Sequence, residues 1–158
     1  MDEQMTITLR NPTVTDAPAI ANLQCVTWRK AYTGVMPDAF LAGLDEATFT
    51  ANWTRALASS GPGEYQVACI ASSIIGFATF GPARDSSIGS LQLKGYAELA
   101  ALNVHPEYWR CGVGARLLSE VEAALLGRYS TMYLWMAEGN ARAQAFYQKQ
   151  GLGPVNTI

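Results

Sequence analysis

Two glycines, Gly112 and Gly114, stand where an extended segment is expected to give way to a helix. Glycine carries no side chain, so the backbone at these positions can approach a ligand closely. The N–H groups in the first turn of a helix have no partner within the helix, and they attract anions, phosphate above all. The spacing therefore indicates either an anion site or a plain helix start in which glycine serves the turn geometry.

Residues that the sequence lacks argue against several other kinds of site. A dinucleotide-binding turn needs a third glycine where the sequence has Leu117, and a Walker loop needs Gly-Lys-Ser/Thr, which does not occur. His105 is the only histidine, so neither a metal site nor a mechanism with paired histidines is expected. The three cysteines are odd in number and far apart, which indicates reduced thiols in a cytoplasmic protein.

The bulk composition favours one globular domain over residues 1–158. Hydrophobic residues make up 49% of the chain, enough for a substantial core. The net charge of -2 offers no basic surface for nucleic acid. The apolar runs are too short for a transmembrane helix, and Met1–Gln4 lacks the basic and apolar parts of a signal peptide, so no membrane association is expected.

The elements that must position the glycine turn follow from apolar periodicity and turn residues. Strands are predicted over 6–10, 65–71, 74–80, 96–104 and 131–136, with a hairpin turn at Ser72-Ser73 and a polar loop over 81–94. Helices are predicted from about 15 to 32, over about 37–57 with a break near 43–45, over 112–126 and over about 140–150. A further short strand is expected before Ile158. The strand–helix–strand unit over 96–136 implies parallel strands, so the class is mixed α/β around one sheet.

Three segments together resemble the GNAT superfamily of N-acetyltransferases. Residues 97–118, AELAALNVHPEYWRCGVGARLL, are similar to its central motif, a strand ending in Val-x-Pro, a Gln/Arg-x-x-Gly-x-Gly/Ala turn and a helix. Residues 140–151, NARAQAFYQKQG, are similar to its Asn-x-x-Ala-x-x-Phe-Tyr-x-x-x-Gly segment, and residues 28–38 resemble one branch of the family. The resemblance implies a mostly antiparallel sheet with one splayed parallel strand pair, about four flanking helices, and acetyl-CoA as co-substrate without a metal.

The chain departs from the family pattern at three places. Trp109 occupies the Gln/Arg slot of the turn, as in many members, so binding through backbone N–H groups is expected to survive. Leu152 stands where phenylalanine is usual. The family usually closes with a hairpin whose last strand inserts into the sheet, and Ile158 comes too early for both strands. Either the chain is shortened or a partner supplies the strand, as in a homodimer.

The resemblance implies a direct acyl transfer to a primary amine. Glu98 would be the general base, acting through a water, and Tyr147 would be the general acid that protonates the leaving thiolate. The backbone N–H of Val104 would stabilise the oxyanion on the thioester carbon. The plainer alternatives are a charged residue at a strand start for Glu98 and a buried aromatic pair, Phe146-Tyr147, for the acid.

The resemblance also implies a coenzyme site along the strand and the turn. Its expected residues are Leu102, Asn103, Val104, Arg110, Cys111, Gly112, Val113, Gly114, Ala115 and Asn140. Leu102 and Val104 would pair with the pantetheine arm like an added strand, and the turn would give N–H groups to the pyrophosphate. Asn140 matches the residue that bonds the pantetheine region, while its plainer role is the N-cap of the last helix.

The amine substrate is less well defined by the sequence. The first two helices and the 81–94 loop set the substrate in this family, and Trp28, Tyr32 and Phe80 there suggest an apolar or aromatic rim. No acidic cluster demands a polycation, so small-molecule and peptide amines both stay open. Two other classes also stay open, namely a non-catalytic acyl-CoA sensor and a generic nucleotide-binding α/β protein.

Overall fold

A computed structural model describes residues 6–61, 63–83, 95–135 and 140–152. The strands are β1 (Ile7–Arg10), β2 (Glu64–Ile70), β3 (Ser73–Pro82), β4 (Tyr96–Val104) and β5 (Thr131–Tyr133). The α-helices are α1 (Ala17–Ala31), α2 (Asp38–Ala42), α3 (Glu46–Ala58), α4 (Val113–Leu125) and α5 (Ala141–Lys149), with 3-10 turns η1 (Val14–Asp16) and η3 (Pro106–Tyr108). The expected order of elements is confirmed, and the break near 43–45 separates α2 from α3.

The turn between β2 and β3 differs from the sequence expectation by one residue. Ser73 already belongs to β3 and pairs with Ile70, so the turn consists of Ala71 and Ser72. Ala71 takes the turn's left-handed backbone conformation, with a φ of 54°. β5 is also shorter than predicted, ending at Tyr133, because the chain leaves its neighbour there. The strand expected before Ile158 lies outside the described residues.

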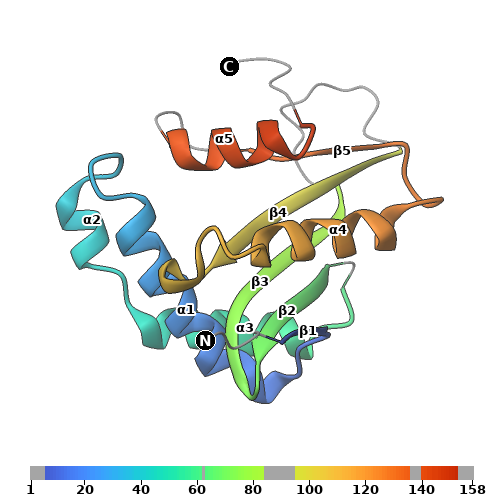
Figure 1. Cartoon of the computed structure of the whole chain (residues 1–158). Coiled ribbons are helices and arrows are strands. Elements are labelled where there is room, and N and C mark those ends of the chain that lie inside the picture. The colour runs from blue at the N-terminus through green and yellow to red at the C-terminus, as the bar shows by residue number, and fades with distance from the viewer. Residues whose placement is uncertain (1–5, 62, 84–94, 136–139, 153–158) are drawn as a thin grey trace.

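The five strands form one sheet in the order β1-β2-β3-β4-β5. Neighbouring strands from β1 to β4 are antiparallel, and β4 and β5 are parallel. Only Tyr96, Ala97 and Glu98 of β4 pair with β5, although β4 runs on to Val104. The two strands diverge beyond this short ladder, as Figure 1 shows. The predicted mostly antiparallel sheet with one splayed parallel pair is therefore confirmed.

A bulge in β4 changes which side chains face which side of the sheet. Thr79 of β3 pairs with Ala101 while Phe80 pairs with Leu99, so Ala100 is an extra residue. Before the bulge, Ala97 and Leu99 belong to the core under α4; after it, Leu102 packs against that core instead. The shift places both Ala100 and Ala101 on the opposite face, next to Glu98, where they line a pocket.

Helices cover both faces of the sheet and build two cores (Figure 1). On one face α4 buries a stripe at helical spacing, formed by Val113, Leu117, Leu118, Val121 and Leu125. On the other face Ile20 and Leu23 of α1 pack on Phe77 of β3, together with Trp53 of α3. The sheet is thus packed against helices on both faces next to the splayed edge. Among the described residues, no helix is both long and apolar enough to cross a membrane.

Candidate active site

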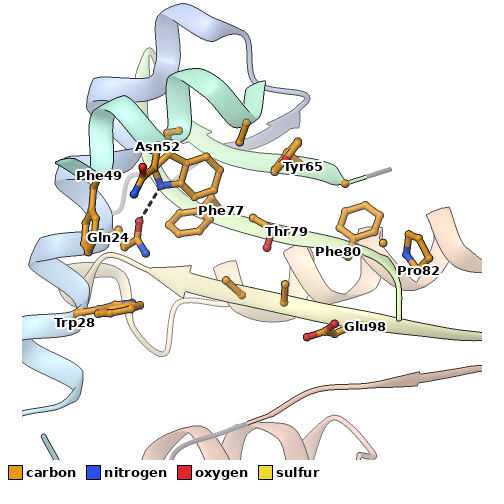
Figure 2. A pocket seen from close by; sticks show the side chains of 16 residues that line it. Gln24, Trp28, Phe49, Asn52, Tyr65, Phe77, Thr79, Phe80, Pro82 and Glu98 are labelled. Atoms are coloured by element: carbon orange, nitrogen blue, oxygen red, sulfur yellow. Dashed lines mark hydrogen bonds between the residues drawn. The ribbon is translucent and has the colours of Figure 1, made fainter. Parts of the chain in front are cut away.

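A pocket of about 440 Å³ opens on the α1–α3 side of the sheet (Figure 2). Its floor is made by β3 and β4, and its walls are made by α1, α3 and the start of β2. The described residues that line it are Gln24, Trp28, Phe49, Asn52, Trp53, Ala56, Gly63, Tyr65, Phe77, Thr79, Phe80, Gly81, Pro82, Glu98, Ala100 and Ala101. The lining is therefore mostly apolar and rich in aromatic residues, and among these residues it holds one carboxylate.

That carboxylate, Glu98, is only 6% exposed. It lies in β4 at the last residue that pairs with both neighbours, opposite Gly81 of β3 and Tyr133 of β5. The Tyr133 hydroxyl donates a hydrogen bond to Glu98 Oε1 at 3.4 Å. Burying a carboxylate is costly unless polar groups compensate it, so this placement favours a functional residue over an ordinary surface charge.

Beyond Glu98, one edge of β4 carries backbone groups that β3 does not use. His105 N–H donates to the Ile75 carbonyl at 2.8 Å, which fixes the alternation of the β3–β4 ladder. In an antiparallel ladder every second residue directs its N–H and C=O away from that partner. By this parity Leu102 and Val104 direct theirs toward the splayed side, where the described part of β5 does not pair with them. The edge is thus suited to an added, strand-like ligand.

Trp109 lies at the end of this edge. Its indole N–H donates to the Val104 carbonyl at 2.7 Å, although the two residues are separated by the η3 turn. The guanidinium of Arg142, from α5, lies over the indole ring at 3.5 Å from its centroid. Burial lowers the pKa of Arg142 from its ordinary value. The tryptophan in the Gln/Arg slot of the motif therefore joins β4 to α5.

The two turn glycines serve different purposes. Gly112 is the N-cap of α4 in the left-handed conformation, with a φ of 86°, and a Cβ there would meet nothing within 4 Å. Arg110 is also left-handed, with a φ of 66°. Gly114 instead makes room for packing, because a Cβ would lie 3.2 Å from the ring of Phe146. The N–H groups of Val113, Gly114 and Ala115 precede the first helical hydrogen bond, from Arg116 to Gly112.

Helix α5 and its N-cap carry the last two residues predicted for the site, Tyr147 and Asn140. The buried Asn140 caps it, accepting from Ala143 N–H at 3.1 Å, which is the plainer of its two expected roles. Tyr147 packs against Phe146 and against the α4 core. Burial, followed by the neighbouring Tyr32 phenol, raises the pKa of Tyr147 to about 12. Its phenol therefore stays protonated at neutral pH, as a proton donor must.

The three expected substrate residues do not all share the pocket. Trp28 and Phe80 line it, whereas Tyr32 is not among the lining residues. Tyr32 packs edge-on against Trp28 and interacts with Tyr147 and Arg142, so it joins α1 to α5. The amides of Gln24 and Asn52, also in the pocket, were missed because polar residues on a helix normally indicate its solvent face.

The chain belongs to the GNAT acetyltransferase family, whose family model, Acetyltransferase (GNAT) family, matches residues 19–152. The Bacillus subtilis protein named uncharacterized N-acetyltransferase YuaI is 31% identical over 145 residues, covering 90% of this chain and 78% of that protein. The mycothiol acetyltransferase of Segniliparus rotundus is 35% identical over 83 residues, which is 52% of this chain and 27% of that protein.

Solved structures share the fold at lower identity. The PaiA N-acetyltransferase of Thermoplasma acidophilum, in complex with coenzyme A, superposes with a TM-score of 0.80 at 21% identity, covering 98% of this chain and 94% of that one. The aminoglycoside N-acetyltransferase AAC(6')-Iy, also in complex with coenzyme A, has a TM-score of 0.75 at 16% identity, covering 100% and 95%. The family and the fold together make this protein an acetyltransferase domain of the GNAT type.

Proposed function

We propose that this protein is an N-acetyltransferase that moves the acetyl group of acetyl-CoA to the primary amine of a small molecule or peptide. The observation that carries the proposal is the position of Glu98. Its buried carboxylate faces the aromatic pocket at the point where β4 and β5 part. An amine in the pocket and a thioester at the splayed edge would meet beside it. This is the arrangement that direct transfer needs.

The residues present fit coenzyme A. The outward-facing N–H and C=O of Leu102 and the N–H of Val104 would pair with the amides of the pantetheine arm, with the buried Asn103 between them. The Val104 carbonyl accepts from Trp109 instead. The N–H groups of the turn from Arg110 to Ala115 would hold the pyrophosphate, since Gly112 leaves open space there. The coenzyme supplies an activated acetyl thioester when it is bound. Asn140, the buried N-cap of α5, would bond its pantetheine region, as the family resemblance implies.

Glu98 is proposed as the general base. An alkylammonium has a pKa near ~10, so at neutral pH a proton must leave before the nitrogen can attack. A buried carboxylate next to the entering amine can accept that proton through one ordered water. The hydroxyl of Tyr133, donating to Oε1, would hold the carboxylate in place while it does so.

The length of β4 determines whether the Val104 N–H can stabilise the oxyanion while Glu98 acts as the base. Glu98 and Val104 are six residues apart, which is roughly 20 Å along an extended strand and somewhat less across the bulge. An oxyanion donor must touch the thioester oxygen, and a base that reaches the attacking amine through one water cannot lie roughly 20 Å from that oxygen. We therefore assign the Val104 N–H to the pantetheine arm, and the donor to the thioester oxygen must lie closer to Glu98.

Tyr147 is proposed as the group that stabilises and protonates the leaving thiolate. A phenol with a pKa of about 12 is a weaker acid than a thiol in water with a pKa of ~8.5, so full transfer would be uphill by about 5 kcal/mol. A thiolate leaving in the same buried surroundings also has a raised pKa, which reduces this difference. Hydrogen bonding from the phenol to the departing sulfur is therefore its first contribution.

The proposal is tested by measuring coenzyme binding and turnover on the same preparation. Isothermal titration should show one site for coenzyme A. Free coenzyme A and acetylated amine should then appear together in a chromatographic assay, which keeps the exposed Cys111 thiol out of the signal. Coenzyme binding with no turnover on any amine would instead support the non-catalytic sensor. Binding of ATP or NAD in preference to coenzyme A would contradict the coenzyme assignment.

A further inference from the structure

Five aromatic side chains enclose the pocket that Glu98 faces, namely Trp28, Phe49, Trp53, Tyr65 and Phe77. A sixth aromatic lining residue, Phe80, has its side chain in the α4 core on the opposite face of the sheet. The five contact one another edge-on rather than standing apart. Trp53 lies 5.1 Å from Phe77 and 5.8 Å from Tyr65, and Trp28 lies 5.8 Å from Phe49, measured between ring centroids. The rings therefore form a pre-organised wall, which favours a flat apolar ligand because little side-chain entropy is lost on binding.

Two amide side chains complete this wall, and the orientation of both is fixed by their partners. The Trp53 indole N–H donates to Gln24 at 2.8 Å, and an indole can only donate, so the accepting atom is Oε1. The guanidinium of Arg55 donates to Asn52, which fixes Oδ1 in the same way. Both carbonyl oxygens are thus engaged. Each amide retains its NH2 group, a donor, for a ligand.

The Glu98 carboxylate lies at one end of the pocket, and the side-chain amides of Gln24 and Asn52 lie at the other. In Figure 2, Glu98 lies at one end beside Phe80 and Pro82, and Gln24 and Asn52 lie at the other end. Phe77 and Gly81, the residue that pairs with Glu98, are four residues apart on β3 and face the pocket, so the floor between the two ends is about 13 Å long. That length fits one aromatic ring with a short alkyl chain.

The charges argue against a polycationic substrate. Among the described lining residues, Glu98 is the one charged side chain. Aromatic faces can bind a second cation, but the far end offers amide N–H2 groups, which repel a cation and attract an acceptor.

From these observations we infer that the substrate is a primary monoamine that carries one aromatic ring and, at the end distant from the amine, a neutral hydrogen-bond acceptor such as a hydroxyl. The ammonium group is placed near Glu98, the ring lies over Phe77 and Thr79 of β3, and the acceptor meets the Gln24 and Asn52 amides. This inference rests on the proposed acetyl transfer and names its substrate class. Polyamines, aminoglycosides and peptides without an aromatic first residue are excluded by it.

A panel of purified amines tests the inference with the full chain and acetyl-CoA. We expect kcat/KM for tyramine and 2-phenylethylamine to exceed that for spermidine, kanamycin and an Ala-initiated peptide by at least about 100-fold. Tyramine should exceed 2-phenylethylamine by about fivefold, the value of one neutral hydrogen bond. A preference for spermidine, kanamycin or the peptide would overturn the substrate class and leave the proposed acetyl transfer intact. No turnover with any amine would instead remove the proposed function itself.

Two isosteric variants test the amide end. Gln24→Glu and Asn52→Asp each keep the oxygen that accepts from Trp53 or Arg55 and replace the NH2 donor by a carboxylate oxygen. Each variant should lose any preference for 2-(4-methoxyphenyl)ethylamine, whose ether oxygen can only accept, over 2-phenylethylamine, and should gain at least about tenfold in kcat/KM for a short diamine such as cadaverine. Asn52 is exposed, so Asn52→Asp is expected to fold even where Gln24→Glu does not. An unchanged preference for the methoxy compound in a folded variant would overturn the role of the amide end.

Discussion

The indole N–H of Trp109 reaches back across the η3 turn to the carbonyl of Val104, at 2.7 Å. Val104 ends the strand whose free edge is the proposed coenzyme track, and Trp109 begins the turn that would hold the pyrophosphate. One hydrogen bond therefore sets the angle between the two halves of the coenzyme site. The guanidinium of Arg142, lying over the same ring, extends this link to α5, the helix that carries Tyr147.

Replacing Trp109 by phenylalanine should remove this hydrogen bond while keeping a ring for Arg142. The Val104 carbonyl would then lose its partner, and the ring would bind the cation less well than an indole does. We expect the free energy of unfolding to fall by about 1–2 kcal/mol in urea titrations with an unchanged m value. Trp135→Phe is the matched control, because Trp135 is 47% exposed and its loss should change stability by less than about 0.5 kcal/mol. Equal effects of the two variants would show that the hydrogen bond contributes nothing.

Gly114→Ala should be destabilising through packing rather than through the backbone. The new methyl group would lie 3.2 Å from one ring carbon of Phe146 and 3.3 Å from another, so the ring would have to move. A loss of about 1–3 kcal/mol is expected, and Phe146→Leu in the same chain should restore part of it. The double-mutant cycle is measured by chemical unfolding, and strict additivity would refute the proposed clash.

Gly112→Ala is the matched contrast. Its φ of 86° is unfavourable for alanine, and a Cβ there meets nothing within 4 Å. The expected cost of about 1 kcal/mol therefore comes from the backbone alone. It should be the same with Phe146 or leucine at position 146, and coupling to that position would contradict this explanation.

Tyr147 should titrate at unusually high pH. Burial raises its pKa to about 12, above the ordinary value of 10, so the folded state favours the protonated phenol. The resulting stability is fully present below pH 10 and is lost as the pH rises through the pKa of about 12, up to ~2.7 kcal/mol in total. Phenolate absorbance near 295 nm, compared between the native chain and Tyr147→Phe, measures this titration. An additional group ionising near pH 10 in the native chain would contradict it.

Much of this organisation follows from local pattern. The stripe from Val113 to Leu125 and the caps at Gly112 and Asn140 are local features, and α4 and α5 begin at these caps. The alternation of β4 can also be predicted from the sequence. Its bulge cannot, because the extra residue, Ala100, stands among apolar neighbours and does not change the pattern. The bulge decides which residues face the pocket, so the sequence alone could not assign them.

The rest depends on contacts between distant segments. Arg142 and Trp109 are brought together only by the docking of α5, and no periodicity relates them. Tyr32 is predicted at the substrate rim from its place after the first helix, and no local pattern indicates its interaction with Tyr147 of α5. Gly114 looked like a residue that admits a ligand, and its nearest neighbour is the ring of Phe146. In each case tertiary packing, which has no local signature, determines the surroundings of the residue.

The central claim is that Glu98 acts as the base for acetyl transfer, and Glu98→Gln tests it most directly. The amide keeps the shape and can still accept from the Tyr133 hydroxyl, but it cannot take up the proton of the amine. With tyramine and acetyl-CoA, we expect kcat/KM to fall by about 10²–10⁴-fold while the Kd for coenzyme A changes by less than about twofold. Turnover within tenfold of the native enzyme at unchanged coenzyme affinity would contradict the assignment.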